Sequence, residues 1–145
     1  MKGGVETRVF DLSQGIEEGW KAFDIGPKSV GVFKETIKRA NSIFWNGPVG
    51  VFEIPEFRKG SQELLNAIVK RTSEGATSVI GGGDSVNLVN SLGLSEGVSF
   101  MSTGGGASVE LMQGNKMPGI DNLTNISELK LEEDFIKKLA TVEAL

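Results

Sequence analysis

Two glycine triplets constrain the fold of this chain more than any other feature of its sequence. Gly81–Gly83 follow the apolar run Ala76–Ile80, and Gly104–Gly106 follow the run Val98–Ser102. Each triplet precedes a helical stretch that a further glycine can end. These stretches are Ser85–Asn90 and Ala107–Gln113. Successive strand, glycine-loop, helix units require parallel strands joined by crossover helices. The sequence therefore predicts an α/β fold, a three-layer α/β/α sandwich with a mainly parallel sheet.

The remaining segments extend this pattern in both directions. Pro27 is expected to open a helix, Ser42–Trp45 to form a short buried strand, and the stretch from Ser61 to a helix end at Gly75 to form a second helix. Thr7–Leu12 is predicted as a first strand. The apolar spacing of Leu131, Phe135, Leu139 and Val142 predicts a final amphipathic helix. We therefore expect an α/β domain over 1–125 and a helical tail over 126–145.

Composition excludes several classes of function. The chain has no cysteine, histidine or tyrosine, so chemistry must rest on carboxylates, lysines, hydroxyls and backbone amides. A net charge of −4 with scattered basic residues argues against a nucleic-acid partner. No apolar run approaches the length of a membrane span, and no apolar stretch follows Lys2 as in a secretory signal. We expect a cytoplasmic protein with no membrane partner.

The glycine loops indicate phosphate chemistry. In open parallel sheets, ligands bind beyond the carboxyl ends of the strands, where both loops are expected to lie. Amides of Gly81–Gly83 and the start of the next helix could approach an anion, and Asp84 could hold a divalent cation that bridges phosphate oxygens. The alternative for this loop is a tight turn with Asp84 as the helix N-cap. Gly104–Gly106 likewise suit either a transferring phosphoryl group or a turn required by packing.

Two common nucleotide motifs are absent. No G-x-G-x-x-G with a downstream ribose-binding acid follows a strand, and Gly26-Pro27-Lys28-Ser29 differs from the end of a P-loop because Pro27 removes an amide donor. We interpret Lys28 as a solvated lysine at the start of a helix.

Four motifs, taken in order along the chain, resemble those of phosphoglycerate kinases. They are Asp24-Ile25-Gly26-Pro27-Lys28-Ser29, Trp45-Asn46-Gly47-Pro48-Val49-Gly50-Val51-Phe52-Glu53, Gly81-Gly82-Gly83-Asp84-Ser85 and Ser102-Thr103-Gly104-Gly105-Gly106-Ala107-Ser108. The chain is similar to the latter part of the family's C-terminal, nucleotide-binding domain. The resemblance therefore implies that the α/β domain over 1–125 is a partial nucleotide-binding domain and forms part of a doubly wound, Rossmann-like domain. The resemblance implies a glycolytic transferase in which 1,3-bisphosphoglycerate and ADP give 3-phosphoglycerate and ATP, with Mg²⁺ as the metal.

The resemblance also implies roles for individual residues. Those expected to border the nucleotide are Asn46, Gly47, Val49 and Phe52, and Glu53 is expected to hold the ribose hydroxyls. Gly83, Asp84 and Ser85 would meet the phosphates, with Asp84 also on the metal. Gly105 and Gly106 would face the transferring phosphoryl group as the catalytic residues.

No part of this chain matches the family's N-terminal domain, which supplies the 3-phosphoglycerate side, or the first half of the C-terminal domain. We therefore expect the chain to be inactive alone and to transfer phosphoryl groups only when those parts are supplied. Two alternatives are a non-catalytic phosphate- or nucleotide-binding module and an oligomeric interaction protein that covers a truncated sheet edge by self-association.

Overall fold

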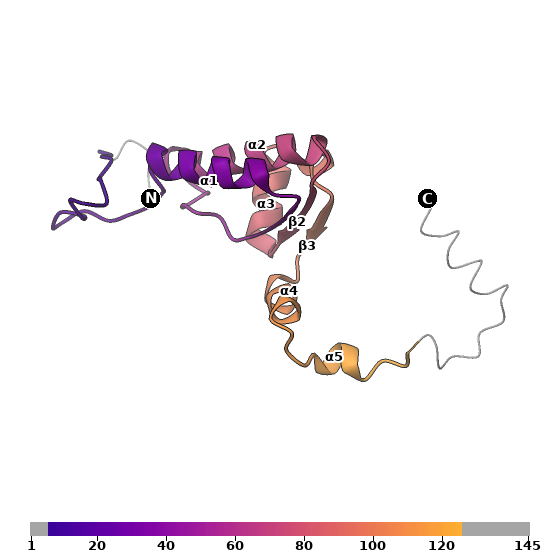
Figure 1. Ribbon diagram of the computed structural model, residues 1–145. Helices are drawn as coiled ribbons and strands as arrows, with labels where there is room; N and C mark the ends of the chain where they lie inside the picture. The colour runs from indigo at the N-terminus through magenta and orange to yellow at the C-terminus, as the bar shows by residue number, and fades with distance from the viewer. Residues whose placement is uncertain (1–5, 126–145) are drawn as a thin grey trace. The chain divides into compact units, whose positions relative to one another are not determined.

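The computed structural model describes residues 6–125 and divides the chain into two compact units, Met1–Val109 and Glu110–Leu145 (Figure 1). The first unit contains the whole β-sheet, and the second contains the short helix α5 (Pro118–Asp121). The expected boundary at 125/126 and the helix expected over 126–145 involve residues outside those that the structure describes. Among the described residues, none of the helices has the length and apolar character needed to cross a bilayer.

Three parallel strands form the sheet in the order β1 (Ser42–Asn46), β2 (Thr77–Gly81) and β3 (Phe100–Ser102). The register pairs Asn46 with Gly81 and Gly81 with Ser102. All three strands therefore end in one row, and the three loops that follow begin side by side. This confirms the predicted α/β class and its parallel sheet.

The helices end where the sequence signals predict, but three of them begin two residues earlier than the expected starts at Ser61, Ser85 and Ala107, because glycines take part in their first turns. The principal helices are α1 (Pro27–Arg39), α2 (Lys59–Ser73), α3 (Gly83–Ser91) and α4 (Gly105–Met112), with 3-10 turns at Pro55–Phe57 and Ser95–Gly97. Pro27 occupies the first turn of α1, where its missing amide costs nothing. Gly75, Gly93 and Gly114, which follow α2, α3 and α4, all have positive φ. Glycines with positive φ therefore mark the C-terminal ends of these three helices.

A small apolar core holds α2 and α3 on one face of the sheet. Its fully buried members are Leu65 and Ile68 from α2, Ile80 from β2, and Leu88 and Val89 from α3. Trp45 and Met101 lie in the same register row as Ile80 and pack against this core. Both α2 and α3 contact β2, and α1 packs along α2 (Figure 1).

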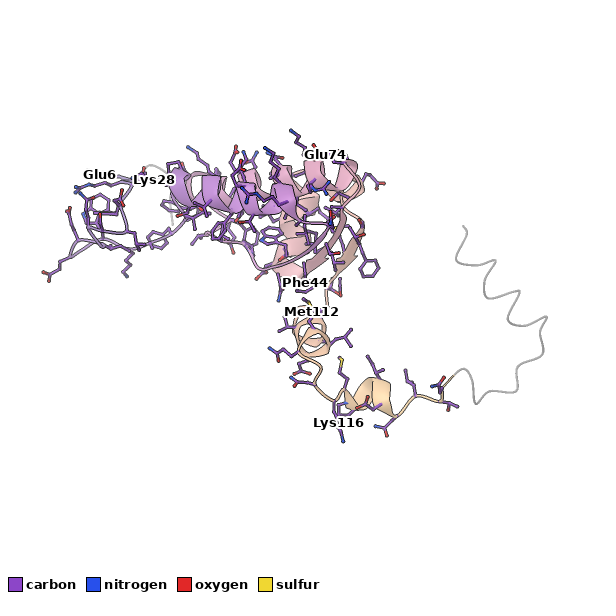
Figure 2. All side chains as sticks on the ribbon, in the orientation of Figure 1. Glu6, Lys28, Phe44, Glu74, Met112 and Lys116 are labelled. Carbon is purple, nitrogen blue, oxygen red and sulfur yellow. The ribbon has the colours of Figure 1, made fainter. Side chains whose placement is uncertain are left out.

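The opposite face of the sheet carries a second apolar row. Phe44, which Figure 2 labels, pairs with Val79, and Val79 pairs with Phe100. Because side chains alternate between the faces of a strand, this row points away from the core of Trp45, Ile80 and Met101. Phe100 is 62% exposed. Neither α2 nor α3 therefore provides the second helical layer of the predicted sandwich.

The prediction of a strand at Thr7–Leu12 is wrong. The structure gives this segment no strand, and Val9 and Leu12 are 67% and 97% exposed. A strand exists only through hydrogen bonds to a neighbouring strand, and this segment pairs with none of the strands in the described residues. A composition that favours β-structure therefore does not by itself make this segment a strand.

Truncation of Leu65 tests the core. Leu65→Ala should lower the free energy of unfolding by about 2–5 kcal/mol, because it leaves a cavity between α2, β2 and α3. Val32→Ala on α1 removes a side chain that is 66% exposed and should change that free energy by no more than about 0.5 kcal/mol. Urea denaturation followed by circular dichroism measures both. Equal, small effects would contradict the assignment of the core.

Candidate functional site

The ends of the three strands bring two glycine loops and Asn46 together. The amide of Gly82, one residue beyond β2, donates a hydrogen bond of 2.8 Å to the carbonyl of Ser102 at the end of β3. This bond continues the β2–β3 pairing into the loops. The first turns of α3 and α4 therefore start from adjacent points at the carboxyl edge of the sheet.

The close approach of these loops requires glycine. A Cβ placed on Gly105 would lie 2.8 Å from Cα of Gly82 and 2.9 Å from Oδ1 of Asn46. Gly82 has φ of 89°, and a Cβ there would lie 2.6 Å from the same Asn46 oxygen. Side chains at either position would push the loops apart. Packing thus explains Gly82 and Gly105, and this packing brings two helix N-termini together.

The two N-termini present backbone amides without intrahelical partners. Val86 donates to the carbonyl of Gly82, and Ser108 donates to that of Gly104; these are the first bonds of α3 and α4. Three amides at the start of each helix precede these bonds. They belong to Gly83, Asp84 and Ser85 in α3, and to Gly105, Gly106 and Ala107 in α4. Together with the positive ends of two helix dipoles, they favour a bound anion.

Asp84 lies next to these first-turn amides. It is exposed in the first turn of α3, whose N-cap is Gly82 with no side-chain cap, so the alternative role of Asp84 as N-cap is not formed. No group of three or more His, Cys, Asp or Glu residues lies together within residues 6–125. A single carboxylate nevertheless fits Mg²⁺ bound chiefly through phosphate oxygens and water.

The segment that runs from the last residue of β1 through the following loop, residues 46–53, is called the loop 46–53 and is held by acceptors from three other segments. Gly47 donates to Oγ of Ser85 at 2.7 Å, Val49 to Oγ of Ser61 at 2.9 Å, and Val51 to the carbonyl of Phe23 at 2.9 Å. Both serines are fully buried. The hydroxyl of Ser85, expected at the phosphates, therefore lies inside and anchors the neighbouring loop, while its backbone amide belongs to the first turn of α3.

The other predicted site residues differ in their exposure. Phe52 is half-buried and packs against the apolar core, whereas Glu53 is exposed and forms none of the ion pairs found within residues 6–125. Gly106 is exposed, and a Cβ there would meet nothing within 4 Å, while Gly105 is buried. Only Gly106 of the two predicted catalytic glycines therefore offers an open surface.

Lys28 lies at the start of α1 beside the N-terminal segment (Figure 2). Its ammonium forms an exposed ion pair with the carboxylate of Asp11, and this contact holds the pKa of Asp11 below its usual value. The interpretation of Lys28 as a solvated lysine is consistent with its 85% exposed side chain. The pairing with Asp11 was not predicted.

Sequence reasoning missed the residues that hold the loop in place. Ser61 and Ser85 lie 12 and 38 residues from their partners, and no local pattern signals such distant bonds. Asp24 was noted only as part of a motif. The one available signal was a serine on the apolar face of each helix, next to Leu64 and Leu65 in α2 and before Leu88 and Val89 in α3.

Comparisons with known proteins agree on one family. The family model described as phosphoglycerate kinase matches residues 3–115. The phosphoglycerate kinase of Thermosipho africanus is 47% identical over 130 residues, covering 90% of this chain and 32% of that protein. That of Tetrahymena thermophila is 50% identical over 129 residues, covering 89% and 31%. The chain thus spans about a third of the length of these relatives.

The solved structures support the same assignment. The structure of phosphoglycerate kinase from Coxiella burnetii matches with a TM-score of 0.61 and 38% identity over 68% of this chain and 25% of that one. The crystal structure of the enzyme from Pyrococcus horikoshii matches with a TM-score of 0.63 and 35% identity over 71% of this chain. The sequence motifs, the converging loops and these matches agree: the chain belongs to the phosphoglycerate kinase family.

Proposed function

We propose that this chain binds the phosphates of Mg-ADP and Mg-ATP between the N-termini of α3 and α4. In the reaction of its family, it would supply the nucleotide side of phosphoryl transfer from 1,3-bisphosphoglycerate to ADP. The observation that carries the proposal is the close approach of Gly82 and Gly105. It places the first-turn amides of α3 and α4 side by side at the ends of adjacent strands. Membership of the family supports the choice of nucleotide.

The roles of the loop residues follow from which of their groups are free. The amides of Gly47 and Val49 already donate to buried serines, so these residues would border the nucleotide through carbonyl groups and apolar surface. The side chains of Asn46 and Glu53 are exposed and available. By family analogy, Glu53 would bind the ribose hydroxyls and Asn46 would lie beside the phosphates, next to Gly82 and Gly105. Phe52 would support the nucleotide from its place on the core.

The chemistry assigned to this chain is positioning and charge neutralisation. An acyl phosphate is already activated, so transfer requires alignment and compensation of the charge on the phosphoryl oxygens. Free amides of α3 would hold phosphates of the nucleotide, and the amide of Gly106 would face the phosphoryl group in transit. Mg²⁺, when bound with the nucleotide beside Asp84, supplies further positive charge. None of these roles needs a proton-transfer residue such as histidine.

Turnover would require more than this chain. The residues that would bind the 3-phosphoglycerate side belong, by family analogy, to the N-terminal domain, and this chain covers about a third of its relatives. We therefore expect binding of nucleotide without catalysis by the chain alone.

Calorimetric titration of the chain with ADP, with and without Mg²⁺, tests this function, together with a coupled phosphoglycerate kinase assay on the same sample. Mg-dependent binding without turnover is the expected result. A chain that binds neither Mg-ADP nor Mg-ATP would contradict the proposal. Turnover by the chain alone would contradict the need for a complementary part.

Asp84→Ala tests the metal role. The substitution removes a carboxylate that would bind Mg²⁺ but would repel bare phosphate, so affinity for Mg-ADP should fall roughly tenfold or more while affinity for metal-free ADP is unchanged or rises. Asp121→Ala, in the first turn of α5, is the matched control and should alter neither. Equal weakening of both ligands by Asp84→Ala would rule out the metal role.

Gly105→Ala tests the convergence of the loops. The added methyl group would collide with Gly82 and Asn46, so the N-termini of α3 and α4 should separate and Mg-ADP affinity should fall at least roughly tenfold. Gly31→Ala on α1, where a Cβ meets nothing within 4 Å, should leave affinity unchanged. Calorimetry of both folded variants measures the effect. Unchanged affinity in Gly105→Ala would show that the close approach is unnecessary.

A further inference from the structure

Asp24 joins segments that are distant in the sequence. Its Oδ2 accepts a hydrogen bond of 2.8 Å from the amide of Gly60, in the first turn of α2, and its Oδ1 accepts one of 2.8 Å from Ile25. The N-cap of α2, Arg58, forms no side-chain cap. Asp24 therefore caps α2 from 36 residues away, with its negative charge at the positive end of the helix dipole.

The same carboxylate lies against Gly50, in the second half of the loop 46–53. A Cβ on Gly50 would lie 2.6 Å from Oδ1 of Asp24, and a Cβ on Gly60 would overlap that oxygen. Both positions therefore admit the carboxylate only because they are glycines. Asp24 fills the space between the loop and the start of α2.

The residue before Asp24 completes this clamp. The carbonyl of Phe23 accepts the amide of Val51, and the ring of Phe23 stacks on Phe57 with centroids 5.1 Å apart. Phe23 and Asp24 thus contact both ends of residues 50–60. Together with the bonds to Ser85 and Ser61, this means that every second amide of the loop, at Gly47, Val49 and Val51, donates a hydrogen bond to the interior of the protein.

We propose that Asp24 is a positioning residue for the loop 46–53, acting on nucleotide affinity without contacting the nucleotide. This inference rests on the proposed function, because the loop carries Asn46 and Glu53. With its inward amides bonded and Gly50 packed against the carboxylate of Asp24, the loop is ordered before the ligand arrives. Binding then loses less conformational entropy, which raises affinity.

Asp24→Asn tests the proposal, since the amide keeps the shape of the carboxylate but loses its charge and one of its two acceptor oxygens. Hydrogen exchange should accelerate at least roughly tenfold at Val51 and Gly60, and Mg-ADP affinity should fall roughly tenfold at a temperature where the variant is fully folded. Asp11→Asn is the matched control. It removes an exposed carboxylate of the same N-terminal segment, paired with Lys28, and should change neither quantity.

Several outcomes would overturn the proposal. Unchanged exchange at Val51 would show that Asp24 does not hold the loop, and faster exchange at Gly60 alone would reduce its role to capping α2. Faster exchange at both amides with unchanged Mg-ADP affinity would show that order in the loop does not affect nucleotide binding. If the unaltered chain binds no Mg-ADP, the proposed function fails, and the proposal that rests on it fails with it; the exchange data would then still decide whether Asp24 holds the loop.

Gly60→Ala provides a second variant if Asp24→Asn does not fold. The added methyl group would push the Asp24 carboxylate away from the start of α2, but Asp24 itself and its charge are retained. Alanine is otherwise favoured over glycine in a helix. The proposal requires faster exchange at Val51 and weaker Mg-ADP binding in this variant as well. Wild-type exchange and affinity in Gly60→Ala would overturn it.

Discussion

The parallel register that ends β1, β2 and β3 in one row is the constraint on which the rest of the structure depends. Because Asn46, Gly81 and Ser102 are cross-strand neighbours, the loops that follow start within reach of one another. The buried packing of Ile80 against α2 and α3 fixes this register, since a shift by one residue would turn the core row of β2 outward. Stability of the core and geometry of the site are therefore two consequences of the same pairing.

The backbone amides near the strand ends are divided between two tasks. Those of Gly47, Val49 and Val51 are bonded inward and hold a loop in place. Those in the first turns of α3 and α4 have no intrahelical partner and offer the positive surface. Ser85 serves both tasks, because its hydroxyl accepts from Gly47 while its amide lies in the first turn of α3. A change in the loop 46–53 should therefore alter the position of the first turn of α3, and the reverse.

Much of the fold followed from local sequence signals, because glycine and proline act on the backbone where they stand. Pro27, Gly75, Gly93 and Gly114 marked helix limits that the structure reproduces. The strand expected at Thr7–Leu12 failed because strand formation depends on a distant partner. For the same reason, no pattern predicted that Ser61 and Asp24 hold the loop 46–53. The glycine loops were found by their repeat, but only the structure shows that Gly82 and Gly105 touch.

In the proposed site, two sets of helix-start amides bind the phosphates of a nucleotide. Nuclear magnetic resonance of the ¹⁵N-labelled chain during titration with Mg-ADP can detect this binding at each position, because each amide gives its own signal. The largest shift changes should fall on Gly83–Ser85 and Gly105–Ala107, with smaller changes in the loop 46–53. Changes confined to other segments, such as residues 6–26, or no saturable change at all, would contradict the account.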